Sequence, residues 1–189
     1  MWDNNTLFHH YQGYYDALKY ASDNGVFIVA AIGNDDDYGA AYSGSGNTNI
    51  YTSTPADFSS VIPGMMSIVA INNTGDKSDY SSYGELGSIA APGGEMNFTN
   101  DPNGILSTVT VNSGKSIDSN VGNGYGYEQG TSMAAPVVAG AAALLLGKNP
   151  NLTPLEIKNI LIQGSYNIRD LEGIVPNGSY LDINNSLIL

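Results

Sequence analysis

Cysteine is absent from the 189 residues, and basic side chains are scarce. Without cysteine the chain has no disulfide framework, no thiolate nucleophile and no cysteine-ligated zinc or iron–sulfur site. Lysine and arginine together number 6 against 18 acidic residues, which leaves a formal net charge of −12. Nucleic-acid binding requires clusters of basic side chains against the phosphates, so we expect no nucleic-acid partner.

Long hydrophobic runs are missing as well. The first five residues include no basic side chain, and no apolar stretch of the kind that a signal peptide carries follows them. The longest apolar stretches, residues 26–32 and 136–147, are shorter than the roughly 18–20 residues that a membrane span needs. The sequence therefore predicts a soluble protein with no signal peptide and no membrane span.

Hydrophobic residues make up 42% of the chain and glycine contributes 23 residues. This composition is typical of a globular, loop-rich domain, and a chain of this length can bury one core of respectable size. We find neither repeats nor a linker, so residues 1–189 are expected to form a single domain.

The pattern along the chain alternates helices with apolar strands. A helix over residues 11–24, closed by Asn24-Gly25, precedes a strand at residues 26–32 that is apolar on both faces. Further strands are expected at residues 66–71, 88–91 and 104–111, and helices at residues 131–146 and from Pro154 onward, with Thr153 and Glu156 as a capping box. Strands that are apolar on both faces belong to parallel sheets covered by helices, so we expect an α/β fold with a mainly parallel sheet.

The segment Gly130-Thr131-Ser132-Met133-Ala134-Ala135-Pro136 opens a helix that is apolar on nearly all faces and should be buried. A serine in the first turn lies where the helix N-terminus stabilises negative charge, as a nucleophile would require. A plain N-cap is the alternative, because serine and threonine cap helices in all kinds of protein. A proline five residues into the helix argues against an ordinary helix.

The stretch GTSMAAPVVAGAAALLL at residues 130–146 closely resembles the nucleophile-serine helix of subtilisin-like serine proteases, the subtilase family (peptidase family S8). Residues 29–34, VAAIGN, are similar to the strand of that family that ends in the oxyanion-hole asparagine. The segments at residues 60–71, 81–84 and 91–93, and the helix after Thr153, also resemble the family in its order. The resemblance covers nearly the whole chain and implies a hydrolase that cleaves peptide or protein substrates.

By this resemblance Ser132 is the nucleophile, the side-chain amide of Asn34 and the Ser132 backbone N–H bind the oxyanion, and Thr131 supports them. The same resemblance implies that the walls of the pocket for the residue before the cleaved bond are formed by Ala30, Ala31, Ile32, Gly33, Thr54 and Pro55. Taken alone, Asn34 reads as a turn residue after a strand.

The aspartate and histidine blocks that subtilases place before the serine are absent. The chain has two histidines, His9 and His10, and they precede the helix that leads to Asn34, so we expect neither to be the general base. The chain thus resembles the C-terminal portion of a catalytic domain, incomplete at its N-terminal side, with a long loop at residues 95–129. We expect it to be inactive alone, and the missing half to be supplied by another polypeptide, by the rest of a longer gene product or through self-association.

No metal site is predicted. Asp35, Asp36 and Asp37 lack the alternating spacing that lets oxygens converge on calcium, and Glu85 is the one carboxylate left in the loop that matches a weak cation site of the family. A structural calcium ion is therefore not supported here, and no other cofactor is expected.

Two other functions compete with the protease. A non-catalytic relative, or pseudoprotease, would use the cleft as a protein-binding or regulatory module, and a hydrolase of another fold would carry Gly-Thr-Ser by coincidence. The resemblance favours a secreted or cell-surface bacterial protein, although the chain shows no signal peptide. The net charge of −12 would modestly favour basic substrates at low salt.

Overall fold

A computed structural model of the chain describes residues 4–34, 55–110 and 124–189, with the backbone alone for residues 4–10. A five-stranded sheet with the strand order β1-β2-β3-β7-β6 lies at its centre. The strands β1 (Ile28–Ala31), β2 (Met65–Ile71), β3 (Ile89–Pro92) and β7 (Ser179–Tyr180) are parallel, and β6 (Tyr166–Asn167) pairs antiparallel to β7. The predicted α/β fold with a mainly parallel sheet is confirmed.

The strand β2 is buried over all seven of its residues because both faces of the sheet are covered. Its side chains alternate between two cores, as the pleat of a strand requires. Met66, Ile68 and Ala70 belong to the core beneath α2 (Thr131–Lys148), whereas Met65 and Val69 belong to the core on the opposite face. This two-sided burial is the reason that six of the seven residues of the strand are apolar, Ser67 being the exception.

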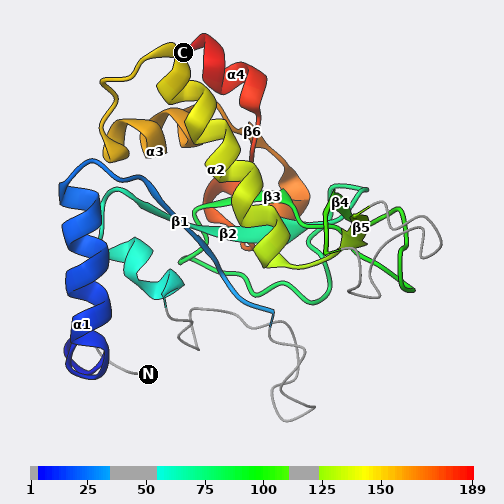
Figure 1. Ribbon diagram of the computed structural model, residues 1–189, viewed down its shortest axis with the longest axis horizontal. Coiled ribbons are helices and arrows are strands. Elements are labelled where there is room, and N and C mark those ends of the chain that lie inside the picture. The colour runs from blue at the N-terminus through cyan, green and yellow to red at the C-terminus, as the bar shows by residue number, and fades with distance from the viewer. Residues whose placement is uncertain (1–3, 35–54, 111–123) are drawn as a thin grey trace.

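Helices cover both faces of the sheet. The first face carries α2, α3 (Pro154–Gln163) and α4 (Ile183–Ile188), which are drawn above the strands in Figure 1. The opposite face packs against Tyr15 and Leu18 of α1 (Asn4–Asp23) and against two short 3-10 helices, η2 (Ala56–Ser60) and η3 (Arg169–Leu171).

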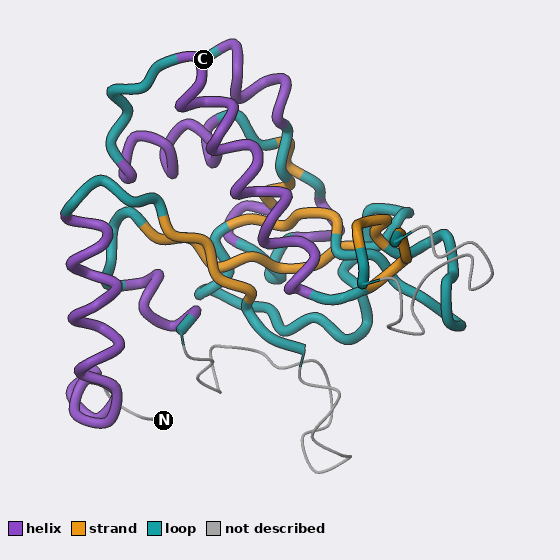
Figure 2. The backbone as a smooth tube through the Cα atoms, viewed as in Figure 1, coloured by secondary structure: helices purple, strands orange, loops and turns teal. Residues whose placement is uncertain are grey.

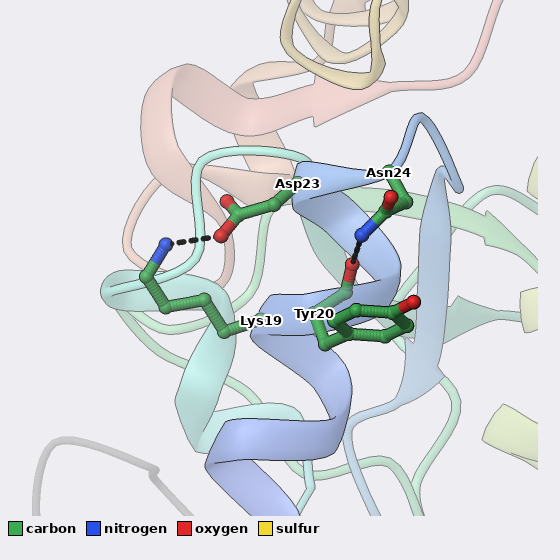
Figure 3. A network of polar contacts seen from close by, with 4 residues as sticks. All are labelled: Lys19, Tyr20, Asp23 and Asn24. Atoms are coloured by element: carbon green, nitrogen blue, oxygen red, sulfur yellow. Dashed lines mark hydrogen bonds and ion pairs between the residues drawn. The ribbon is translucent and has the colours of Figure 1, made fainter.

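The helix α1 extends further toward the N-terminus than predicted and has a break at Tyr11, where φ is −124°. Its C-terminal end is closed as expected: the Asn24 side-chain amide donates to the Tyr20 carbonyl at 2.8 Å, and Gly25 follows with φ of +88° (Figure 3). The Lys19–Asp23 ion pair in the same turn joins two well-exposed side chains, so it contributes little to stability.

The helix α2 differs from its prediction. We expected burial on nearly all faces, but its buried side chains form a single stripe against the sheet, and Leu144 on the other side is 53% exposed. Within the part of the chain that the structure describes, α2 is the helix that is long and apolar enough to cross a membrane. Helices packed in a protein core meet the same criterion, and α2 packs on β1, β2 and β3.

The long connection before α2 contains a hairpin of β4 (Ile105–Thr108) and β5 (Tyr125–Glu128), which pair antiparallel. The hairpin lies beyond the end of the sheet from which α2 begins (Figure 2). The first strand was predicted, within the broader range 104–111. The second was not, because Tyr125-Gly126-Tyr127-Glu128 contains a glycine and lacks an apolar run.

Candidate active site

Ser132 is the second residue of α2, at the C-terminal edge of the parallel strands. The N-cap residue is Gly130, and no side chain caps this helix end. The alternative interpretation of Ser132 as a plain N-cap is therefore wrong. Ser132 is exposed, and its hydroxyl makes no hydrogen bond to any side chain that the structure describes.

Asn34 lies three residues beyond the end of β1 and is fixed through its backbone. It forms an isolated antiparallel bridge with Ser81, and the Ser82 N–H donates to the Gly33 carbonyl at 3.0 Å. Ser81 and Ser82 are both fully buried. Asn34 is thus held by the structure around it, and is more than a turn residue at the end of a strand.

Thr131 joins Asn34 to the start of α2. The Thr131 backbone N–H donates to Asn34 Oδ1 at 3.0 Å, and the Thr131 hydroxyl donates to the same oxygen at 2.9 Å. The hydroxyl also accepts the Gly33 N–H at 3.3 Å. Because both donors of Thr131 converge on Oδ1, the Asn34 side-chain NH2 group faces away from Thr131 and remains able to donate.

Gly130 leaves room for that NH2 group. Its φ of +146° is a conformation that side-chain-bearing residues rarely adopt, and a Cβ placed there would lie 3.3 Å from Asn34 Nδ2. The Gly130 N–H donates to the Gly93 carbonyl at 3.0 Å and to the Tyr80 hydroxyl oxygen at 2.9 Å. The sequence offered no local signal for this contribution of Tyr80, which is 50 residues away along the chain.

The first turn of α2 supplies a second donor beside Asn34. Backbone N–H groups in the first turn of a helix lack partners within the helix, and that end of the helix carries partial positive charge. The Ser132 N–H is one of these groups. Pro136 lies four residues further on and has no N–H to give to the Ser132 carbonyl, so the turn that carries the serine is released from one helical hydrogen bond.

Of the residues expected to form the walls of the substrate pocket, some are accessible at the surface and others are buried. Ala31 and Gly33 are partly exposed, whereas the side chains of Ala30 and Ile32 are buried in the core with Phe58. Pro55 precedes η2 and is partly exposed. Thr54 lies outside the described residues.

Among the side chains that the structure describes, no general base lies beside Ser132. His9 and His10 belong to the first half of α1, which lies on the far side of the molecule from the start of α2 (Figure 1). Their side chains lie outside the described residues. Within the described ranges, Asn34, Thr131 and Ser132 therefore come together without an acid–base partner.

The described residues contain no group of three or more metal-ligating side chains. Asp35, Asp36 and Asp37 lie outside the described residues. Glu85 is exposed at the opposite end of the sheet from Ser132. The expectation that the chain binds no metal or other cofactor stays a prediction.

Comparison with known proteins places these features in one family. The model of the subtilase family matches residues 4–180. Alkaline elastase YaB from a Bacillus species is 34% identical over 152 residues, which are 80% of this chain and 31% of the relative. Subtilisin DY from Bacillus licheniformis is 34% identical over 158 residues, which are 82% of this chain and 46% of the relative.

Solved structures show the same likeness. A structure of proteases from Pseudoalteromonas arctica superposes with a TM-score of 0.71 at 34% identity, covering 92% of this chain and 45% of that one. Fervidolysin from Fervidobacterium pennivorans, described as a keratinolytic enzyme related to subtilisin, gives a TM-score of 0.70 at 27% identity, with coverage of 93% and 24%. The chain spans less than half the length of each of these relatives.

Proposed function

Because the chain belongs to the subtilase family, we propose that residues 1–189 form the part of a serine endopeptidase domain that carries the nucleophile and the oxyanion hole. The observation that carries the proposal is the pair of hydrogen bonds from Thr131 to Asn34 Oδ1, at 2.9 and 3.0 Å. Together they present the Asn34 NH2 group beside the first turn of α2, where Ser132 lies exposed.

In the proposed reaction the Ser132 hydroxyl oxygen attacks the scissile carbonyl carbon, and its proton passes to a histidine base. The carbonyl oxygen becomes negatively charged and accepts hydrogen bonds from Asn34 Nδ2 and the Ser132 N–H. When the tetrahedral intermediate collapses, the C–N bond breaks and the amine leaves with the proton. Water then hydrolyses the acyl-enzyme by the same steps, which frees Ser132.

The base and its aspartate partner must come from outside these residues. The long polypeptide that the relatives carry beyond the matched portion is the natural source, and it would reach this chain as another polypeptide or as part of a longer product. Without it, the Ser132 hydroxyl keeps its proton, since an alcohol of ordinary pKa is a weak nucleophile. We therefore propose that the isolated chain does not hydrolyse peptides.

The substrate is proposed to be an uncharged or basic peptide segment. Ala31 and Gly33 bring no charge to the cleft, and the net charge of −12 attracts basic peptides at low salt. The family resemblance and the bacterial origin of the matched relatives support a secreted or cell-surface location in a bacterium.

To test the proposal, the part of the catalytic domain that would carry the histidine and the aspartate is added to the chain. The segment of subtilisin DY that precedes the matched portion is fused to the N-terminus of this chain, and cleavage of a chromogenic tetrapeptide anilide is followed. We expect turnover that is abolished by Ser132→Ala. Asn34→Ala should lower it by about 10²–10³, the loss known for the corresponding donor in subtilisin itself.

A folded fusion that binds peptides without cleaving them would contradict the proposal and favour the pseudoprotease. The relevant control is Asn184→Ala, which alters an exposed asparagine of α4 and should leave turnover unchanged. Turnover that survives in the Ser132→Ala fusion would point to a different nucleophile and would also contradict the proposal.

A further inference from the structure

A cavity of about 300 Å³ lies at the opposite end of the sheet from Ser132. It is bordered by η2, by residues 85–88 before β3, by α3 and by η4 (Pro176–Gly178). Ser132 and Asn34 lie at the carboxyl ends of the strands, whereas this cavity adjoins their amino ends. The seven residues of β2 separate the two sites by roughly 20 Å at the rise of a strand.

Lys158 of α3 brings a positive charge to the cavity wall. Its Nζ donates to the Met65 carbonyl at 2.8 Å and to the Ser59 carbonyl at 3.4 Å. Burial lowers the pKa of Lys158 below its ordinary value. Among the side chains that the structure describes, no carboxylate lies within ion-pairing distance of this ammonium. A half-buried charge without a counter-ion is costly, and an anion in the cavity would offset that cost.

Two neutral donors on the same wall complement the ammonium. Asn177 has a left-handed backbone with φ of +57°, and its side-chain amide makes no hydrogen bond to any described residue. The Ser88 hydroxyl oxygen accepts the Ser67 N–H at 3.1 Å, which leaves the Ser88 O–H able to donate. With Lys158 they form a donor set suited to a carboxylate, which accepts several hydrogen bonds at once.

A negative group and an apolar surface complete the cavity. Glu85 lines it with a carboxylate, while Leu86, Ile162 and Pro176 contribute apolar surface. Glu85 would repel a simple anion and Lys158 would repel a simple cation. A ligand that carries both charges complements the charges of both side chains, and the volume lies at the lower end of the range for ligand sites.

We propose that this cavity binds a free α-amino acid with an aliphatic side chain. Its carboxylate contacts Lys158, Asn177 and Ser88, its ammonium faces Glu85, and its side chain packs on Leu86 and Ile162. The site is independent of the proposed peptidase reaction, because it shares no residue with Asn34, Thr131 or Ser132.

The test measures binding to the full 189-residue chain by calorimetry, with L-leucine as the probe. N-acetylleucine lacks the ammonium and leucinamide lacks the carboxylate, and each should bind at least about tenfold more weakly than leucine. If either analogue bound as tightly as leucine, the proposal would be overturned. It would also be overturned if leucine showed no binding at about 50 times a millimolar Kd, a concentration that saturates such a site.

Substitutions of residues that line the cavity test whether leucine binds there. Lys158→Met should weaken leucine binding by about tenfold or more. Asn177→Gly should weaken it by a few-fold, since glycine keeps the left-handed backbone and the Lys158 hydrogen bonds while removing the amide. Lys148→Met, which changes a lysine at the end of α2, is the matched control and should bind as the original chain does.

The variant Glu85→Gln tests the contact with the ammonium group of the ligand separately from the contacts with its carboxylate. It should weaken leucine but not N-acetylleucine, so that the two bind nearly alike. If Lys158→Met fails to give a cooperative thermal transition, Asn177→Gly and Glu85→Gln decide the matter alone. Unchanged leucine binding in both of these variants would overturn the proposal.

Discussion

Thr131 is the residue on which the candidate site most depends. It is 1% exposed and directs two hydrogen bonds to a single oxygen of Asn34, 97 residues away. Its hydroxyl cannot be replaced by a methyl group without depriving the partly buried Gly33 N–H of its acceptor and Asn34 Oδ1 of one of its two donors. Thr131 thus positions Asn34, the residue that we propose as a donor to the oxyanion.

We expect Thr131→Val to destabilise the chain by about 1–3 kcal/mol, because two partly buried hydrogen bonds of the Thr131 hydroxyl are lost. Urea unfolding measures this loss, and the NMR signals of the Asn34 side-chain amide should move. Thr108→Val on the exposed strand β4 is the control and should change stability by less than about 0.5 kcal/mol. Equal effects of the two substitutions would contradict the assigned role of Thr131.

The pKa of the Tyr80 hydroxyl predicts how the stability of the chain depends on pH in alkaline solution. Burial is the main cause that raises the pKa of its hydroxyl above the ordinary 10.0. Above pH 10 the unfolded chain therefore loses this proton before the folded chain does, so unfolding releases a proton and stability falls as the pH rises. We expect the stability advantage of the original chain over Tyr80→Phe to shrink between pH 9 and pH 11. A constant difference over this range would contradict the raised pKa.

Among the helices, α3 has the start that its sequence predicts. Glu156 Oε2 accepts the Thr153 N–H at 2.8 Å, and the Thr153 hydroxyl accepts the Glu156 N–H at 3.3 Å. This reciprocal pair could be predicted because all of its determinants lie within four consecutive residues. Interactions that are local in sequence are the ones that sequence reasoning recovers best.

The capping box predicts a response to acid. Hydrogen bonds from the Thr153 backbone N–H and then its hydroxyl lower the pKa of Glu156 below the ordinary 4.5. Their stabilisation is present above that value and is lost as the pH falls through the lower folded-state pKa. An NMR titration should show a lowered pKa for Glu156 that moves back toward 4.5 in Thr153→Ala. An unchanged Glu156 titration in this variant would contradict the capping box.

Two of the three consecutive leucines near the end of α2, Leu144 and Leu145, test which of its faces is buried. Leu145 is 3% exposed and packs in the core, whereas its neighbour Leu144 is 53% exposed. We expect Leu145→Ala to cost about 2–5 kcal/mol and Leu144→Ala to cost far less. Chemical denaturation of the two variants measures the contrast. Similar losses would mean that the outer face of α2 is buried in solution.

For the whole molecule, the sequence predicted the parallel sheet, the strand β2 and the helices around it because each has its own periodicity or capping residues. The exposed face of α2 could not be predicted, since an apolar sequence does not tell which of its sides finds a neighbour. The hydrogen bonds of Tyr80 with Gly130 and of Thr131 with Asn34 could not be predicted from local sequence patterns, because they join residues 50 and 97 positions apart. Asn34 and Ser132 were predicted from the family resemblance, and the structure brings their neighbourhoods together.

The surface of the molecule fits a partner on the β1 side. Among the described strands, β1 is the edge of the sheet and pairs with β2 alone. The apolar outer face of α2 is exposed. An open strand edge and an apolar helix face are surfaces that proteins normally cover, which supports the proposal that a further segment of polypeptide packs against this chain.

The central claim is that Ser132 and Asn34 form one part of a catalytic apparatus that is inert without a base. Hydrolysis of a chromogenic tetrapeptide anilide by the purified 189-residue chain, beside its Ser132→Ala variant, tests this claim most directly. We predict that neither protein cleaves the substrate faster than buffer does. Turnover by the original chain that disappears in Ser132→Ala would contradict the account.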